Sequence, residues 1–117
     1  VKYYLVEFNE LNGGHEEPHE HKHLVKAPSH VKDEVVAELT VLYFFTDDSG
    51  DKPSPDWEYE GGSWKEWTCY GHTYFDWVAT EIPRADFDVL GKYLYEVSRY
   101  NQDIDWDFDI DKLKEAA

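Results

Sequence analysis

The order of hydrophobic and polar residues predicts two β-strands at the start of the chain. Residues 2–8 alternate between two side-chain sets rich in β-forming residues, and the run closes at an Asn-Gly-Gly turn. Residues 19–27 also alternate with a period of two and stop at Pro28, which cannot donate a ladder hydrogen bond. We therefore expect both strands to precede the first helix.

A helix is predicted over residues 29–45. Ser29 can cap its first turn, and apolar side chains recur at the spacing of one helical face, at Val31, Val35, Leu39 and Leu42. The many β-branched residues in this stretch leave a strand open as an alternative. Residues 46–55 are rich in Asp and hold two prolines, which is typical of a loop.

Three more strands and a helix are predicted in the second half. Residues 57–60 and 63–70 flank a Gly-Gly pair able to form a hairpin turn, and residues 73–80 alternate as a third strand. Pro83 suits the first turn of a helix, whose apolar face is formed by Phe87, Leu90, Leu94 and Val97.

These elements run in the order ββ-α-βββ-α, followed by an acidic C-terminal strand or tail. The order predicts an α+β fold: a mainly antiparallel sheet of four to six strands with two helices packed on one face. A length of 117 residues suits one domain, residues 1–117.

Charge narrows the partners that we expect. The formal net charge is −15, from 26 acidic and 11 basic residues, whereas direct DNA or RNA binding requires Lys and Arg to neutralise phosphates. A single cysteine, Cys69, allows no intrachain disulfide, and no apolar run approaches the roughly 20 residues that span a bilayer. We therefore expect a cytoplasmic protein, monomeric or homodimeric, that binds neither nucleic acid nor membranes.

Acidic and apolar residues alternate without a break over residues 103–111. As a strand, this segment would present one row of carboxylates, spaced about 6.6 to 6.8 Å apart, from Asp103, Asp105, Asp107, Asp109 and Asp111. Such a row would bind a basic surface of a partner protein and could imitate the phosphates of a nucleic acid, as an inhibitor made by a phage would. An edge strand whose charges prevent aggregation explains the same pattern.

Aromatic residues are concentrated in three adjacent predicted strands, over residues 57–80. One sheet face cannot hide all of them, and exposed Trp and Tyr are enriched at protein interfaces, so Trp64 and Trp67 are candidate partner-binding residues. The alternative is cross-strand packing within the sheet.

Four of the six histidines lie in residues 15–23. On a strand, His19, His21 and His23 project from one face and offer imidazole ligands for Zn or Ni. The spacing matches no recognised zinc pattern, and ligands spread along a flat strand do not converge on one ion, so a polar, solvated strand face is the competing interpretation.

Catalytic patterns are weak in this sequence. Cys69 lies within a predicted strand, and acidic pairs such as Glu58 and Glu60 are expected by chance among 26 acidic residues. We therefore predict a small acidic binding protein without enzymatic activity. A metal-binding module that uses residues 15–23 and a protein with no ligand of its own are the alternatives.

Overall fold

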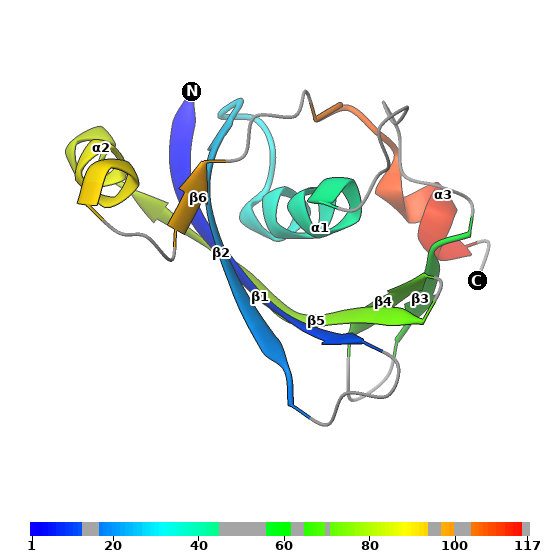
Figure 1. Cartoon of the computed structure of the whole chain (residues 1–117). Coiled ribbons are helices and arrows are strands. Elements are labelled where there is room, and N and C mark those ends of the chain that lie inside the picture. The colour runs from blue at the N-terminus through cyan, green and yellow to red at the C-terminus, as the bar shows by residue number, and fades with distance from the viewer. Residues whose placement is uncertain are drawn as a thin grey trace.

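The computed structural model of the chain describes residues 1–12, 17–44, 56–61, 65–69, 71–93, 97–99 and 104–115. The predicted loop over residues 46–55 lies outside them, as do Trp64 and Asp103. The elements are β1 (Lys2–Asn12), β2 (His19–Ala27), α1 (Asp33–Phe44), β3 (Glu58–Glu60), β4 (Glu66–Cys69), β5 (His72–Ile82), α2 (Arg84–Tyr93), β6 (Val97–Arg99) and α3 (Ile110–Glu115) (Figure 1).

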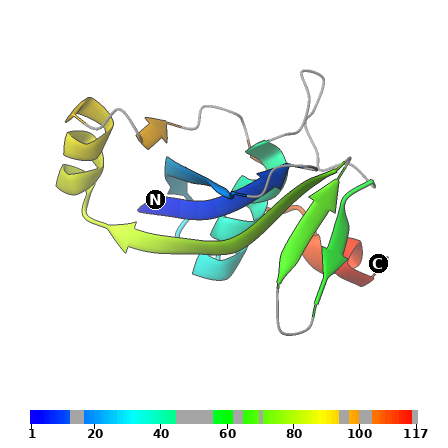
Figure 2. The same cartoon turned by 60° about the horizontal axis from the view of Figure 1, so that its bottom comes forward.

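The strands form one curved sheet in the order β3-β4-β5-β1-β2-β6. All neighbouring pairs are antiparallel except β2 and β6, which run parallel. The α+β class and the order ββ-α-βββ-α are thus confirmed, and β6 and α3 are added after them. The second predicted helix is shorter than expected: α2 ends at Tyr93, Leu94 lies outside the described residues, and Val97 begins β6 because it pairs with Lys22 of β2. Figure 2 shows α2 at one end of the sheet and the β3–β4 hairpin with α3 at the other.

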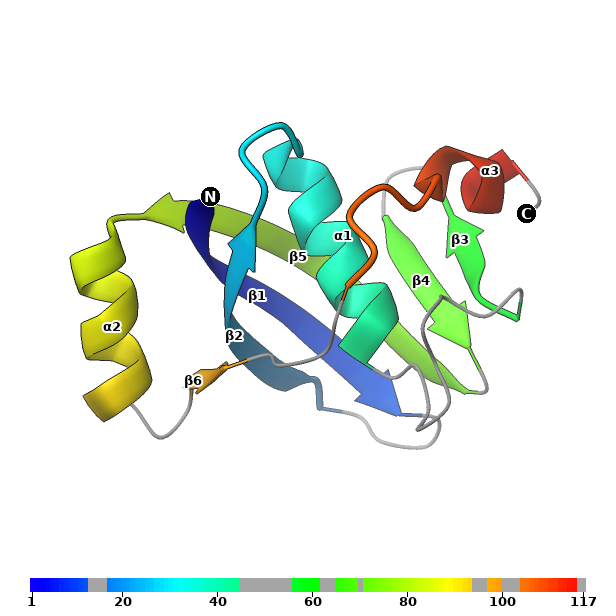
Figure 3. The ribbon, with the colours of Figure 1, turned by 90° about the horizontal axis from the view of Figure 1, so that it is seen from above.

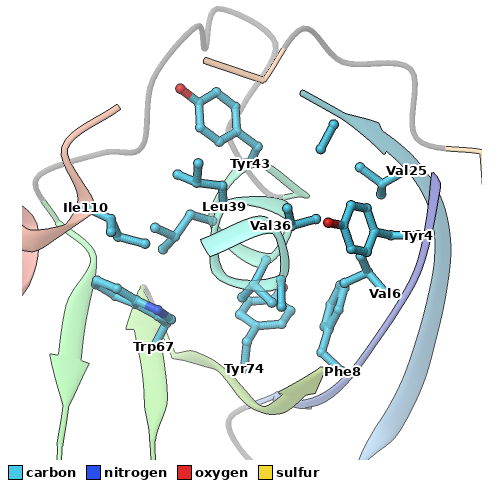
Figure 4. Close-up of a cluster of buried hydrophobic side chains, with 14 of the residues drawn as sticks. Tyr4, Val6, Phe8, Val25, Val36, Leu39, Tyr43, Trp67, Tyr74 and Ile110 are labelled. Atoms are coloured by element: carbon cyan, nitrogen blue, oxygen red, sulfur yellow. The ribbon is translucent and has the colours of Figure 1, made fainter. Parts of the chain in front are cut away.

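The main core lies between the concave face of the sheet and α1. Alternate residues of β1, namely Tyr4, Val6 and Phe8, point toward the helix (Figure 4). All eight residues from Val36 to Tyr43 are buried, so α1 is enclosed on every side rather than amphipathic. This burial explains why its sequence is rich in β-branched residues and still forms a helix, because tertiary packing overrides intrinsic propensity.

The two predicted helices lie on opposite faces of the sheet, so the prediction that both pack on one face is wrong. Ile110 of α3 joins α1 in the main core, whereas Phe87 of α2 packs with Leu24, Tyr3 and Leu5 in a second cluster. Tyr3 and Leu5 alternate with the core-facing residues of β1, so α2 covers the convex face. It covers that face only at one end (Figure 3).

A β-bulge in β5 changes which side chains face the core. Glu7 pairs with Val78 and Asn9 with Phe75, so β5 contains one extra residue between these two pairs. Asp76, within that stretch, has a φ of 55°, a conformation that Asp tolerates better than most residues. After the bulge Trp77 and Ala79 pack against the main core, on the same side as Tyr74.

No helix in the part of the chain that the structure describes is long and apolar enough to span a membrane.

Candidate functional site

The predicted strand over residues 103–111 is wrong for the described residues 104–111. Residues 104–109 form an irregular segment with a turn at 106–107, and α3 begins at Ile110. The Asp105 carboxylate accepts the N–H of Asp107 at 3.0 Å, and the Asp109 carboxylate accepts the N–H of Lys112 at 3.4 Å. Asp side chains that bond to the backbone in this way favour turns and helix caps over strands.

Alternation of burial nevertheless persists along this segment. Ile104, Trp106 and Phe108 are half-buried against the main core and Ile110 is buried. Between them the carboxylates face solvent, and we call this set the acidic row: Asp105, Asp107, Asp109 and Asp111. The apolar side chains therefore hold the row against the body of the protein with its charges outward.

The ion pairs that lysines form in the described part of the chain lie away from the acidic row. The lysines whose ion pairs the structure defines bind elsewhere: Lys2 with Glu81, Lys65 with Glu34 and Lys114 with Glu38. Asp107 lies 3.4 Å from Nε2 of His30, and the Asp107 side chain remains 88% exposed. A contact of this length between exposed groups contributes little to stability.

A buried ion pair joins α1 to α3, the helix that follows the acidic row and contains its last residue. Lys114 Nζ lies 2.9 to 3.0 Å from the two carboxylate oxygens of Glu38, whose side chain is 1% exposed. Burial raises the pKa of Glu38, although the ion pair with Lys114 acts in the opposite direction. Lys114 also lies over the ring of Tyr59, 4.8 Å from its centroid. These contacts fix the end of the segment that carries the acidic row.

Trp67 is a core residue, so its prediction as a partner-binding residue is wrong. Its side chain is 0% exposed and packs at a centroid distance of 4.8 Å against Tyr59 on the concave face. Figure 4 shows it in the same cluster as Ile110. Cross-strand packing thus accounts for Trp67, because it faces the side of the sheet that α1 and α3 cover.

The three predicted metal ligands do not form a metal site. His19 is exposed, His21 is partly buried, and His23 is only 4% exposed, stacked on Phe8 and packed beside Phe44. Within the described parts of the chain, no group of three or more His, Cys, Asp or Glu side chains is arranged to hold a metal ion. The rings of His21 and His23 stack with their centroids 6.0 Å apart, and imidazoles spaced along one strand in this way do not converge on one ion.

His21 instead belongs to a cluster around Glu10 that sequence reasoning missed. The buried Glu10 carboxylate accepts the Tyr74 hydroxyl at 3.0 Å, and its two oxygens lie 2.8 Å from His21 Nε2 and 3.2 Å from His72 Nδ1. Burial alone would raise the pKa of Glu10, but hydrogen bonds with His21, Tyr74 and His72 together lower it. The ionised carboxylate therefore ties β1 to both of its neighbouring strands.

Cys69 lies at the end of β4, directly opposite His72 of β5. Burial, followed by the nearby charges of Asp56 and Glu58, raises the pKa of its thiol, so the reactive thiolate is disfavoured. Glu58 and Glu60 are exposed on the hairpin edge. The absence of enzymatic activity stays a prediction.

In comparisons with known proteins, no family model, no curated protein and no solved structure matches this chain. Any function must therefore be inferred from the chain's own residues.

Proposed function

We propose that the protein binds a basic surface of a partner protein through the acidic row. The observation that supports this most strongly is the one-sided arrangement of residues 104–111, in which alternate apolar side chains pack on the core and the carboxylates between them face solvent. Four carboxylates held on a folded segment lose less conformational entropy on binding than the same charges in a flexible tail.

The overall charge supports the same kind of partner. A net charge of −15 repels nucleic acids and acidic proteins and accelerates encounters with basic ones. Since α3 is anchored by Lys114 and Ile110, the acidic row is attached to the packed core of the molecule. A partner would then meet a preformed surface.

Imitation of a nucleic acid is a narrower form of this proposal. The turn at residues 106–107 departs from the even spacing of an extended strand, so the proposal does not depend on phosphate-like distances. An inhibitor of this kind would displace duplex DNA from a DNA-binding protein in a gel-shift assay. If duplex DNA stays bound while a simple basic peptide still binds the protein, the imitation is ruled out and the basic-surface proposal stands.

The test of the proposal uses a blocked octa-arginine peptide as the probe and titration calorimetry as the measurement. Replacing Asp105, Asp107 and Asp109 by Asn removes three charges, yet Asn keeps the side-chain oxygen that accepts the backbone N–H groups of residues 107 and 112. We expect the peptide affinity to fall at least about ten-fold, because three neighbouring charges act on the same peptide.

A charge-matched variant controls for the loss of net charge. Glu7→Gln, Glu20→Gln and Glu58→Gln remove the same three charges from β1, β2 and β3, on the convex side of the sheet. Their combined effect should be about three-fold or less, because these side chains lie on the face of the sheet opposite α1 and α3 and the solvent between the two faces screens their charges. If both triple variants lost the same affinity for the peptide, the acidic row would contribute only through the net charge and would not be a specific binding surface.

A further inference from the structure

A pocket of about 320 Å³ lies beside the N-terminal turn of α1. Asp33, Glu34 and Ala37 of α1 line one side, residues 77–79 of β5 line the other, and Lys65 completes it. The Asp107 carboxylate contacts His30, three residues before α1, so the acidic row passes near the same end of the helix.

The pocket lies where the pairing of β4 with β5 stops, next to the bulge in β5. β4 pairs with β5 only as far as Glu66 opposite Phe75, and the extra residue at Asp76 follows at once. Residues 77–79 of β5 therefore have no partner residue in β4, which begins at Glu66. The first turn of α1 lines the pocket opposite them. Bulges commonly occur where a sheet is opened next to a binding site.

Two carboxylates and an aromatic ring give the pocket its chemistry. Asp33 Oδ1 accepts the hydroxyl of the buried Tyr4 at 2.9 Å, which fixes this carboxylate. Trp77 is half-buried against the core, with its ring 6.5 Å from that of Tyr59, and forms an aromatic wall. Carboxylates beside an indole are suited to a planar cation, which can hydrogen-bond to the former and stack on the latter.

Glu34 already holds a cation from the chain itself. Lys65 Nζ lies 3.1 Å from Glu34 Oε1, and the hydrogen bond and charge of Lys65 lower the pKa of Glu34. Both side chains are more than half exposed, so the pair is weak and Lys65 is free to swing into solvent. With Lys65 displaced, the two carboxylates outweigh the partial positive charge of the α1 N-terminus.

We propose that this pocket receives an arginine side chain of the basic partner, whose guanidinium displaces Lys65 from Glu34, binds Asp33 and stacks on Trp77. This inference rests on the proposed function, because it supplies the specific contact of a partner that the acidic row attracts. It assigns to Lys65 the role of an internal competitor.

The test uses N-acetyl-arginine amide as the probe and N-acetyl-citrulline amide as its neutral isostere. Binding is followed through the indole N–H resonance of Trp77 in two-dimensional NMR spectra. We expect a saturable shift with arginine, with a dissociation constant in the millimolar range, and none with citrulline. Glu34→Gln should weaken arginine binding at least about three-fold, and Glu20→Gln, a charge-matched change on the convex face, should leave it unchanged within about 1.5-fold.

Lys65→Gln gives the decisive result. Removing an internal competitor should strengthen arginine binding about two- to five-fold, the range expected for an exposed ion pair, whereas Lys112→Gln on α3 should have a smaller effect. Unchanged or weaker binding in Lys65→Gln, or equal shifts with citrulline, would overturn the pocket assignment.

Failure of the pocket and failure of the proposed function give different results. If octa-arginine binding depends on the acidic row but not on Glu34 or Lys65, the pocket assignment fails and the proposed function stands. If the arginine probe binds the pocket while the Asp→Asn triple variant binds octa-arginine like the wild type, the proposed function fails and the pocket remains.

Discussion

The free energy of unfolding is expected to fall by about 2 kcal/mol between pH 7.5 and pH 5, and most of this fall should disappear in His23→Phe. Burial, with a smaller contribution from the charge of His21, lowers the pKa of His23 from 6.5 to about 4. The unfolded state therefore takes up a proton between these values while the folded state does not. The contribution of His23 to the free energy of unfolding is fully present above pH 6.5 and is lost as the pH falls toward 4.

Urea unfolding followed by Trp fluorescence measures this effect. The pH range stays above 5 to avoid precipitation near the sequence isoelectric point of about 4.5. Phe is the chosen replacement because His23 already packs against the rings of Phe8 and Phe44. The slope of stability against pH can be read even if Phe changes the absolute stability. His30→Gln is the control, since His30 is exposed. An unaltered pH slope in His23→Phe would show that His23 does not cause the loss of stability at acidic pH.

Lys114→Ala is expected to reduce the free energy of unfolding by about 2 kcal/mol at pH 7. It leaves the Glu38 carboxylate buried without its partner, and a buried carboxylate that loses its ion pair is costly. Because burial already raises the pKa of Glu38, removing the cation raises it further, so protonation relieves the penalty as the pH falls. The loss should therefore be smaller at pH 5 than at pH 7.

Lys112→Ala is the matched control on the same helix, because Lys112 is exposed; it should change stability by less than about 0.5 kcal/mol. Thermal and urea unfolding at both pH values supply the comparison. If Lys114→Ala were no more destabilising than Lys112→Ala, the ion pair would not be what anchors α3. A loss that grew toward acidic pH would contradict the role given to Glu38.

Local patterns predicted the elements well where one periodicity dominated. The strand over residues 19–27 is observed with the predicted bounds, and the helix predicted over residues 29–45 contains α1. Side-chain alternation also predicted outward carboxylates at residues 105–111, although the backbone there is not a strand. A period of two predicts extended structure, whereas Asp105 and Asp109 bond to the backbone and form a turn and a helix cap.

Features that depend on the pairing of strands far apart in the sequence could not be predicted. The cluster at Glu10 requires His21 and His72 to flank it from two neighbouring strands, and only the strand register brings them together. The bulge near Asp76 likewise shifts Trp77 to the core side without a glycine to mark it. Burial of Trp67 depends on α3 and α1 covering that face, which the order of residues within β4 does not reveal.

The most direct test of the acidic row as the binding surface is to map the octa-arginine peptide on the protein by NMR. Backbone amide shifts are recorded during a titration of the ¹⁵N-labelled protein. We predict that the largest shifts fall on residues 104–111 and on the first turn of α1, with the convex face of β1 and β2 little changed. Shifts spread evenly over both faces of the sheet, or largest on β1 and β2, would contradict it.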